Sequence, residues 1–255
     1  MRRKLALILA AMLSCTFISC GSKNDSSSSS ESSVEESSES SEISEESSES
    51  SEESSEESSG SEAASSIDGF EFGTVENGIY TSSFNGMSFT APEGFEFSSE
   101  EEILSMLDIG TDIIGGDNAD LYKELASKTT IYDMMAQNAS TGESVIIMYE
   151  NLTAYGYDVD DFTIDDYVTA MESQFSLAAS SGVNYESAGS GTATLCGKEF
   201  KRYDYNCEMT SYNYSTTQSY YLSLENGLIT GIIVSKGISE NEAPFYEACF
   251  SEYTA

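Results

Sequence analysis

"VIIMY" at residues 145–149 and "LITGIIV" at residues 228–234 decide the fold, because each carries apolar residues at consecutive positions. Successive side chains of a β-strand point to opposite faces of its sheet, so a strand with this pattern is covered on both sides. The polar connections that precede them, "NASTG" and "ENG", have the length of hairpin loops, and hairpins join antiparallel strands. The sequence therefore predicts an α+β fold, a three-layer α/β/α sandwich around a largely antiparallel sheet.

Two helices are predicted before the first of these strands. Residues 99–110 begin with Ser99, three residues before Glu102, and end at a glycine. This is the spacing of a capping box, in which two side chains bond the first free N–H groups of a helix. A second, short helix is predicted over residues 115–127, with the Asp or Asn at 117–118 as its cap.

The main amphipathic helix is predicted over residues 162–180. It has Thr163 and Asp166 at the capping spacing. Its apolar residues fall on one helical face: Tyr167, Met171, Phe175 and Ala178. Four strands follow, with turns at "CGKE" and "ENGL", and residues 239–253 are predicted to form a terminal helix. We expect the main helix to cover one face of the sheet, and the terminal helix with residues 98–107 to cover the other.

A strand and turn open the domain in a pattern of the form Gly-hydrophobic-x-Phe-x-x-Pro-x-Gly-aromatic. The matching residues are Gly86, Met87, Phe89, Pro92, Gly94 and Phe95, and a late "GKEF" hairpin follows at residues 197–200. This pattern resembles PsbP-like proteins, in particular the PsbP-like lipoproteins of Gram-positive bacteria, although Phe95 stands where that family usually has Trp. The resemblance implies the α/β/α sandwich fold and carries no catalytic residue.

The N-terminus, "MRRKLALILAAMLSCTFISCGS", has the parts of a signal peptide: three basic residues and then an apolar run over residues 5–13. The sequence "FISC" resembles the lipobox of bacterial lipoproteins. That resemblance implies a signal peptide over residues 1–19, lipidation of Cys20, and anchoring at the extracytoplasmic face of the cell membrane. Two alternatives are an ordinary secretory signal, with Cys20 incidental, and lipidation at Cys15.

Ser and Glu dominate the segment that follows the lipobox. Such a composition cannot bury enough apolar surface to offset the entropy of ordering, so residues 20–66 are predicted to be a lipidated Cys20 and a disordered spacer. Modification of the "SSEE" repeats is the alternative role. The remaining residues, 67–255, have the length of one domain.

Acidic residues outnumber basic ones in this domain by 31 to 6. Binding of nucleic acid is therefore excluded as a function, since phosphates require a basic surface. The one basic cluster is Lys198, Lys201 and Arg202, which we interpret as part of a solvated hairpin.

The chain contains no His, which removes the usual general base near neutral pH and the commonest transition-metal ligand. No catalytic residue, cofactor or metal ligand is predicted. Asp158, Asp160, Asp161, Asp165 and Asp166 lie close together in the sequence. The spacing of a calcium loop fails there, because Thr163 replaces the turn glycine and Thr169 the bidentate Glu, although a calcium site in this loop stays open.

Tyrosine and cysteine residues are the remaining candidates for functional groups. Six tyrosines fall between residues 203 and 221; we interpret them as core residues, with a sugar- or peptide-binding surface as the alternative. Cys196, Cys207 and Cys249 are expected to be three free, buried thiols.

The function predicted from the sequence is that of a membrane-anchored, surface-exposed, non-enzymatic module that binds a ligand or an unknown protein or glycan partner. The alternative is a carboxylate-dependent hydrolase acting on cell-wall or glycan material. Such an enzyme requires two buried acids that face each other across a cleft.

Overall fold

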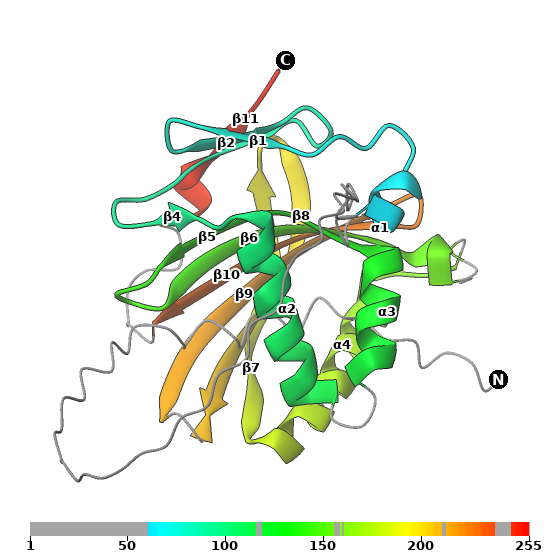
Figure 1. Cartoon of the computed structure of the whole chain (residues 1–255), viewed down its shortest axis with the longest axis vertical. Helices are drawn as coiled ribbons and strands as arrows, with labels where there is room; N and C mark the ends of the chain where they lie inside the picture. Colours follow the sequence, from blue (N-terminus) through cyan, green and yellow to red (C-terminus); the bar gives the residue numbers. More distant parts are fainter. Residues whose placement is uncertain are drawn as a thin grey trace, which may run out of the picture.

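The computed structural model describes residues 61–115, 119–155, 159, 161–210, 213–237 and 246–254. Most of the strands form one antiparallel seven-stranded sheet in the order β4-β5-β6-β10-β9-β8-β7 (Figure 1). Its strands are β4 (Glu96–Phe97), β5 (Thr130–Asn138), β6 (Glu143–Asn151), β7 (Val183–Leu195), β8 (Lys198–Met209), β9 (Tyr214–Glu225) and β10 (Leu228–Gly237). The predicted α+β class and the antiparallel sheet are confirmed.

The two strands that decide the fold, β6 and β10, are neighbours in the middle of this sheet. Ile147 lies opposite Ile232, and Ile146 lies opposite Ile233. Ile146 and Ile147 are both buried, but they belong to two different core clusters, one on each face of the sheet. Covering of both faces, as predicted from the consecutive apolar residues, is confirmed.

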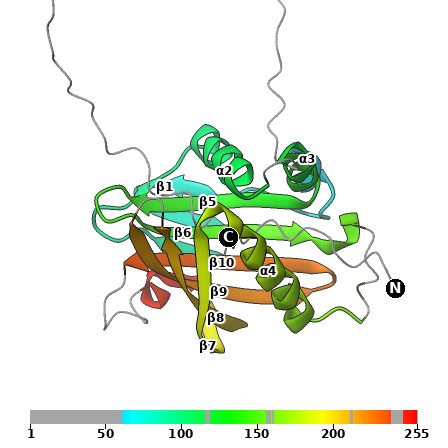
Figure 2. The same cartoon turned by 90° about the horizontal axis from the view of Figure 1, so that it is seen from below.

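Helices cover one face of the large sheet. They are α2 (Glu100–Gly115), α3 (Ala119–Thr129) and α4 (Ile164–Ala178), with short 3-10 turns at η3 (Leu152–Tyr155) and η4 (Ala179–Ser181) (Figures 1 and 2). Both predicted capping boxes are present. The Ser99 backbone N–H donates to Glu102 at 2.7 Å, and the Glu102 N–H donates back to the Ser99 hydroxyl at 3.3 Å. Thr163 and Asp166 make the same reciprocal pair at α4.

Two details of the predicted helices are wrong. Helix α2 does not end at Gly110 but continues to Gly115. One glycine inside a helix costs only about 1 kcal/mol, which the packing of the helix offsets. Helix α2 also lies on the same face as α4, since Ile103 of α2 shares the core cluster of Tyr167 and Met171. The predicted cap at 117–118 lies outside the described residues.

The other face of the sheet is covered mainly by a second sheet and not by the predicted helices. This four-stranded sheet has the order β1-β2-β3-β11, with β1 (Thr74–Glu76), β2 (Ile79–Ser82), β3 (Met87–Thr90) and β11 (Phe250–Glu252). The described part of the predicted terminal helix is the 3-10 turn η6 (Glu247–Cys249) followed by β11. Pairing with β3 places Phe250 against Phe89, with ring centroids 4.9 Å apart. Residues 239–245 lie outside the described part.

Helix α1 (Ser61–Ser65) lies in the last part of the segment predicted as spacer. Ala63 is fully buried in the same core cluster as the small sheet. The side-chain amide of Asn151 donates to the Ser66 carbonyl and hydroxyl oxygens at 3.2 and 3.0 Å. Residues 61–66, which the composition assigns to the spacer, therefore belong to the folded part of the described chain.

The predicted hairpin turns are confirmed. Asn226 and Gly227 have φ values of 51° and 79°, and Cys196 and Gly197 have φ values of 51° and 71°. Two successive residues with positive φ make the hairpin turn that matches the twist of antiparallel strands. These turns set the registers of β9 with β10 and of β7 with β8.

Candidate functional site

The predicted lipidation site, Cys20, lies outside the described residues, and so do Asp158 and Asp160 of the acidic loop. The remaining acids at the start of α4 have structural roles. Asp165 accepts hydrogen bonds from the Lys201 ammonium and the Tyr203 hydroxyl, both at 2.8 Å. Lys201 lowers the pKa of Asp165, and the Tyr203 hydroxyl adds to this effect.

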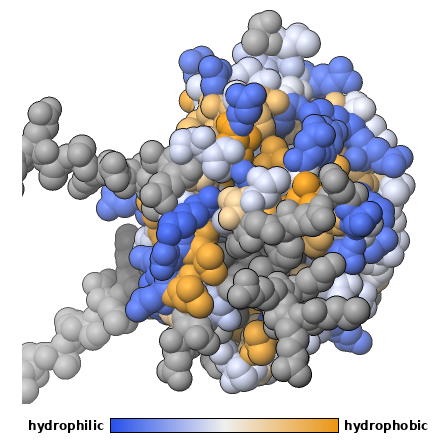
Figure 3. Space-filling model, turned by 90° about the vertical axis from the view of Figure 1, so that its right-hand side faces the viewer, coloured by the Kyte–Doolittle hydropathy of each residue, from blue (hydrophilic) through white to orange (hydrophobic). Residues whose placement is uncertain are grey.

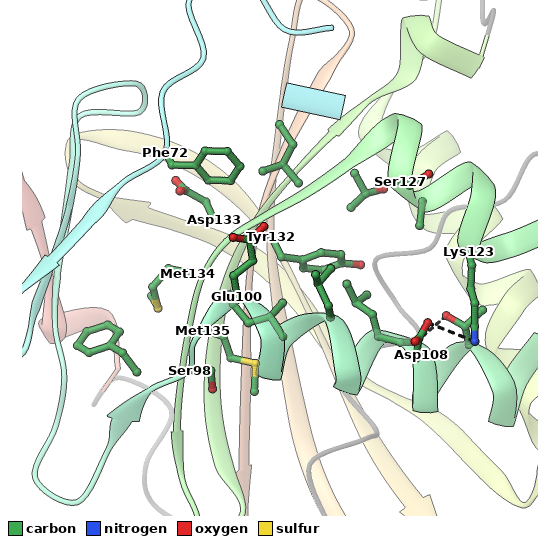
Figure 4. A pocket seen from close by; sticks show the side chains of 18 of the residues that line it. Phe72, Ser98, Glu100, Asp108, Lys123, Ser127, Tyr132, Asp133, Met134 and Met135 are labelled. Atoms are coloured by element: carbon green, nitrogen blue, oxygen red, sulfur yellow. Dashed lines mark hydrogen bonds and ion pairs between the residues drawn. The ribbon is translucent and has the colours of Figure 1, made fainter. Parts of the chain in front are cut away.

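A cavity of about 500 Å³ lies between helices α2 and α3, strand β5 and the segment before β1 (Figure 4). Its wall is mostly apolar. Ile103, Leu104 and Leu107 come from α2, Ile131, Met134 and Met135 from β5, and Phe72 and Val75 from the opposite side. Phe72 and Val75 are 49% and 47% exposed, so the apolar surface continues from the cavity to its mouth.

The cavity wraps around an open edge of the large sheet. Ile131 and Met134 belong to the core cluster on the small-sheet side, whereas Met135 belongs to the cluster on the helix side. Both sides of β5 line one cavity because the edge strand β4 is only two residues long. It pairs with Ala136 and Gln137 and leaves the earlier residues of β5 without a neighbouring strand among the described residues.

Asp133 is the polar group at the small-sheet end of the cavity. The pairing of β5 with β6 shifts between Tyr132 and Met134, so Asp133 is the extra residue of a β-bulge. Its carboxylate accepts hydrogen bonds from the Gly73 backbone N–H at 2.7 Å and from the Tyr80 hydroxyl. Burial raises the pKa of Asp133 above its ordinary value, and these hydrogen bonds oppose the shift.

Tyr132 points from β5 toward the helix side of the cavity (Figure 4). Its hydroxyl oxygen is buried and has no hydrogen-bond partner among the described residues. Burial raises the pKa of Tyr132, and the negative charge of Glu150 adds to the shift. Glu150 is itself fully buried and accepts a hydrogen bond from the Tyr167 hydroxyl at 2.6 Å.

The helical rim of the cavity is closed by ion pairs. The Lys123 ammonium of α3 lies 3.2 Å from Asp108 and 3.1 Å from Asp112, both on α2 (Figure 4). The side chains are 32% (Lys123), 66% (Asp108) and 64% (Asp112) exposed. Ion pairs this accessible to water contribute little to stability. Their effect is positional, because they hold α2 and α3 side by side above the cavity.

Within this cavity, the acids do not form the facing buried pair that the hydrolase alternative requires. Asp133 is the only acid that is half-buried in the cavity wall, since Glu100 is exposed and Asp108 is 66% exposed. The fully buried acid, Glu150, does not line the cavity. Within the part of the chain that the structure describes, no group of three or more Cys, Asp and Glu side chains converges as metal ligands do.

The tyrosines of β8 and β9 are largely core residues, as interpreted from the sequence. Tyr205, Tyr220 and Tyr221 are buried, and the Tyr205 hydroxyl donates to Glu172 of α4 at 3.0 Å. Tyr212 lies outside the described residues.

Of the basic cluster, Lys198 and Lys201 are exposed as expected, but Arg202 is half-buried. Arg202 packs within 5.7 Å of the Tyr221 ring and pairs with Asp204 at 2.9 Å, so its side chain is only 21% exposed. No disulfide joins the three cysteines to one another. Cys207 is buried as expected, but Cys196 and Cys249 are half-buried.

Sequence reasoning missed the cavity. The signal available was Asp133, a charged residue inside the apolar run "TIYDMMA". A charge in a strand that is otherwise apolar indicates a bulge or a buried partner. The short edge strand β4, which opens the cavity, has no comparable signal.

The surface of the described residues is otherwise mixed. On the face that carries α1 and α3, apolar patches are small and separated by polar residues (Figure 3). Among the described residues, no helix is long and apolar enough to cross a membrane.

No family model matches the chain, and no curated protein matches its sequence. Among solved structures, the chain is similar to the solution structure of cyanobacterial PsbP (CyanoP) from Synechocystis sp. PCC 6803, with 12% sequence identity and a TM-score of 0.42. The similarity covers 72% of this chain and 98% of that chain.

Proposed function

We propose that the chain is a membrane-anchored lipoprotein at the extracytoplasmic face of the membrane, and that its folded domain is a non-enzymatic module that binds a largely apolar ligand. The observation that carries the binding function is the cavity between α2, α3 and the open edge of β5. Its volume and its largely apolar wall, with a few polar groups such as Asp133 and the Tyr132 hydroxyl, are typical of sites for small molecules.

The lining supports an apolar and uncharged ligand. Met134 and Met135 supply flexible, polarisable side chains that adapt to different shapes. Asp133, the half-buried acid of the lining, already accepts two hydrogen bonds. Lys123, the half-buried base of the lining, is paired with two acids of α2. Residues 61–255 carry 32 acids against 6 bases. An anionic ligand would meet this negative field, whereas a neutral apolar ligand is indifferent to it.

The test uses a neutral fluorescent probe, N-phenylnaphthylamine, with the chain from residue 21 onward, which lacks the predicted signal peptide and Cys20. We expect saturable fluorescence enhancement in the wild type and its loss in Ser127→Phe, because Ser127 of α3 lines the cavity and a phenyl ring would fill part of it. The matched control is Ser173→Phe on α4. Both serines donate to a backbone carbonyl of their own helix at 2.9 Å, but Ser173 is exposed and does not line the cavity.

Retained probe binding in Ser127→Phe, or equal loss in both variants, would contradict a site in this cavity. Circular dichroism of each variant confirms that the helices remain folded.

The anchor has a separate test, in which Cys20 is substituted. Lipid transfer requires a thiol nucleophile at the lipobox, and stable anchoring requires more than one acyl chain. We expect Cys20→Ala to abolish incorporation of labelled palmitate and to release the protein from the membrane fraction. Labelling that persists in this variant would contradict the lipobox interpretation.

A further inference from the structure

Strand β7 forms the second edge of the large sheet, at the opposite end from β4. It is 13 residues long and has a strand neighbour only on the β8 side among the described residues. Its central residues, 186–192, are exposed on both faces. The backbone N–H and C=O groups on the outer side of an edge strand are a template for pairing with another strand.

The usual protections of an edge strand are missing from most of β7. Proteins block such edges with very short strands, with Lys, with Pro or with bulges. Strand β7 contains no Lys, Arg or Pro, and Glu186 is its only charged residue. A bulge falls between Ser187 and Gly189, which leaves residues 189–195, "GSGTATL", as an uncharged and regularly paired segment.

The space around this segment is open. A Cβ atom added to Gly189 or Gly191 would meet no atom within 4 Å. The side chains of Ser190, Thr192 and Thr194 are exposed. Small side chains let a second backbone approach, and Ser and Thr make favourable pairs across neighbouring strands.

We infer that β7 is a self-association edge, at which residues 189–195 pair antiparallel with the same residues of a second copy of the chain. A two-fold axis through Thr192 places Ser190 opposite Thr194 of the second copy. Pairing about such an axis is isologous and closed, so it gives a dimer and not a filament.

The charge distribution favours a second copy at this edge. Residues 61–255 carry 32 acids and 6 bases, so two copies repel one another over most of their surface. The hairpin of β7 and β8, residues 183–209, holds three of those six bases against four acids. It is therefore almost neutral, and two copies can approach at this edge with little electrostatic repulsion.

The test is sedimentation equilibrium of the chain from residue 21 onward, over a range of concentrations in about 0.15 M salt, where the charges of distant groups are screened. We expect the wild type to form a dimer as its concentration rises. We also expect the amide protons of residues 189–195 to exchange more slowly in the dimer.

The discriminating variant is the double substitution Ser190→Lys with Thr194→Lys. It places like charges opposite each other twice across the axis, and we expect the association constant to fall about tenfold or more. Neither Lys meets a like charge in its own hairpin, because Ser190 lies opposite Tyr203 and Thr194 lies opposite Glu199. Unchanged circular dichroism shows that the fold is kept.

The matched control is Thr169→Lys with Ser173→Lys on α4, which has the same residue types, spacing and charge change at exposed positions. We expect this control to dimerise at least as well as the wild type, because the added positive charge reduces the repulsion between two acidic domains. The inference would be overturned if the wild type stayed monomeric at every concentration, and equally if it did so but bound a different polypeptide. Equal association of the two double variants, whether both dimerise or both are monomeric, would overturn it as well.

Discussion

Deletion of residues 24–60 and deletion of residues 24–66 are expected to differ in their effect on stability, although the second removes only six residues more. The shorter deletion ends just before α1, and we expect no change in the unfolding temperature. The longer one removes α1 with Ala63, which is fully buried, and Ser66, which accepts two hydrogen bonds from Asn151.

The size of the effect depends on what remains behind. The stabilisation from the packing of α1 is largely offset by the entropy lost when its residues are ordered, so the net contribution of this packing to the free energy of unfolding is small. Asn151, which is only 7% exposed, then loses both acceptors of its side-chain amide. An unsatisfied buried donor costs about 1–3 kcal/mol. For a domain of this length each kcal/mol shifts the unfolding temperature by about 2–4 °C, so we expect a decrease of about 2–12 °C.

Thermal unfolding followed by circular dichroism measures the difference between the two deletions directly. Both deletions also remove most of the acidic spacer, so the effect of its charge cancels in the comparison. Unfolding temperatures that agree within about 1 °C would show that α1 contributes nothing to the stability of the fold, and the boundary at residue 67 would be correct after all.

Two further variants test the layers and the cavity. Ile146→Ala and Ile147→Ala should each lower the free energy of unfolding in urea by about 2–5 kcal/mol, because both side chains are fully buried but on opposite faces; a cost well below 1 kcal/mol for either would contradict two covered faces. Burial raises the pKa of Asp133, so the native state holds this proton more tightly than the unfolded state and ionisation of Asp133 destabilises the fold. Relative to the wild type, Asp133→Asn should therefore gain stability as the pH rises from 3.8 through the raised pKa, and parallel pH profiles of the urea midpoint would refute this.

The middle layer of this fold could be predicted from the sequence because its signal is local. The apolar pattern of β6 and β10 indicates burial on both faces whatever the covering elements are. The turns at Cys196-Gly197 and Asn226-Gly227 set the β7-β8 and β9-β10 hairpins through backbone conformation alone. The capping boxes of α2 and α4 are local in the same sense, since each joins residues three positions apart.

The second outer layer could not be predicted in the same way, because it is assembled from distant pieces. Strand β11 has three residues and pairs with β3, which lies about 160 residues earlier in the chain. Tyr246, Cys249 and Phe250 have a spacing that a helix would also place on one face. For so short a segment, the hydrogen bonds offered by the open edge of β3 outweigh helix propensity, which is a weak preference.

The cavity depends on non-local structure for a related reason. It exists because β4 pairs with only two residues of β5, and the length of a strand pairing depends on both partners and not on either sequence alone. The bulge at Asp133 adds to this, since it shifts the following residues of β5 relative to β6. A sequence can indicate the bulge through its misplaced charge, but it does not indicate the space beside it.

The two proposed surfaces lie at opposite edges of one sheet, and this separation decides how the experiments combine. In the order of the sheet, β5 and β7 are separated by β6, β10, β9 and β8, or about 24 Å at the usual spacing of strands. Effects of substitutions that share no contact at such a distance are usually additive. Loss of probe binding in Ser127→Phe should therefore leave dimerisation unchanged, and the Lys pair on β7 should leave probe binding unchanged. Because the two properties are separable, failure of one proposal carries no consequence for the other.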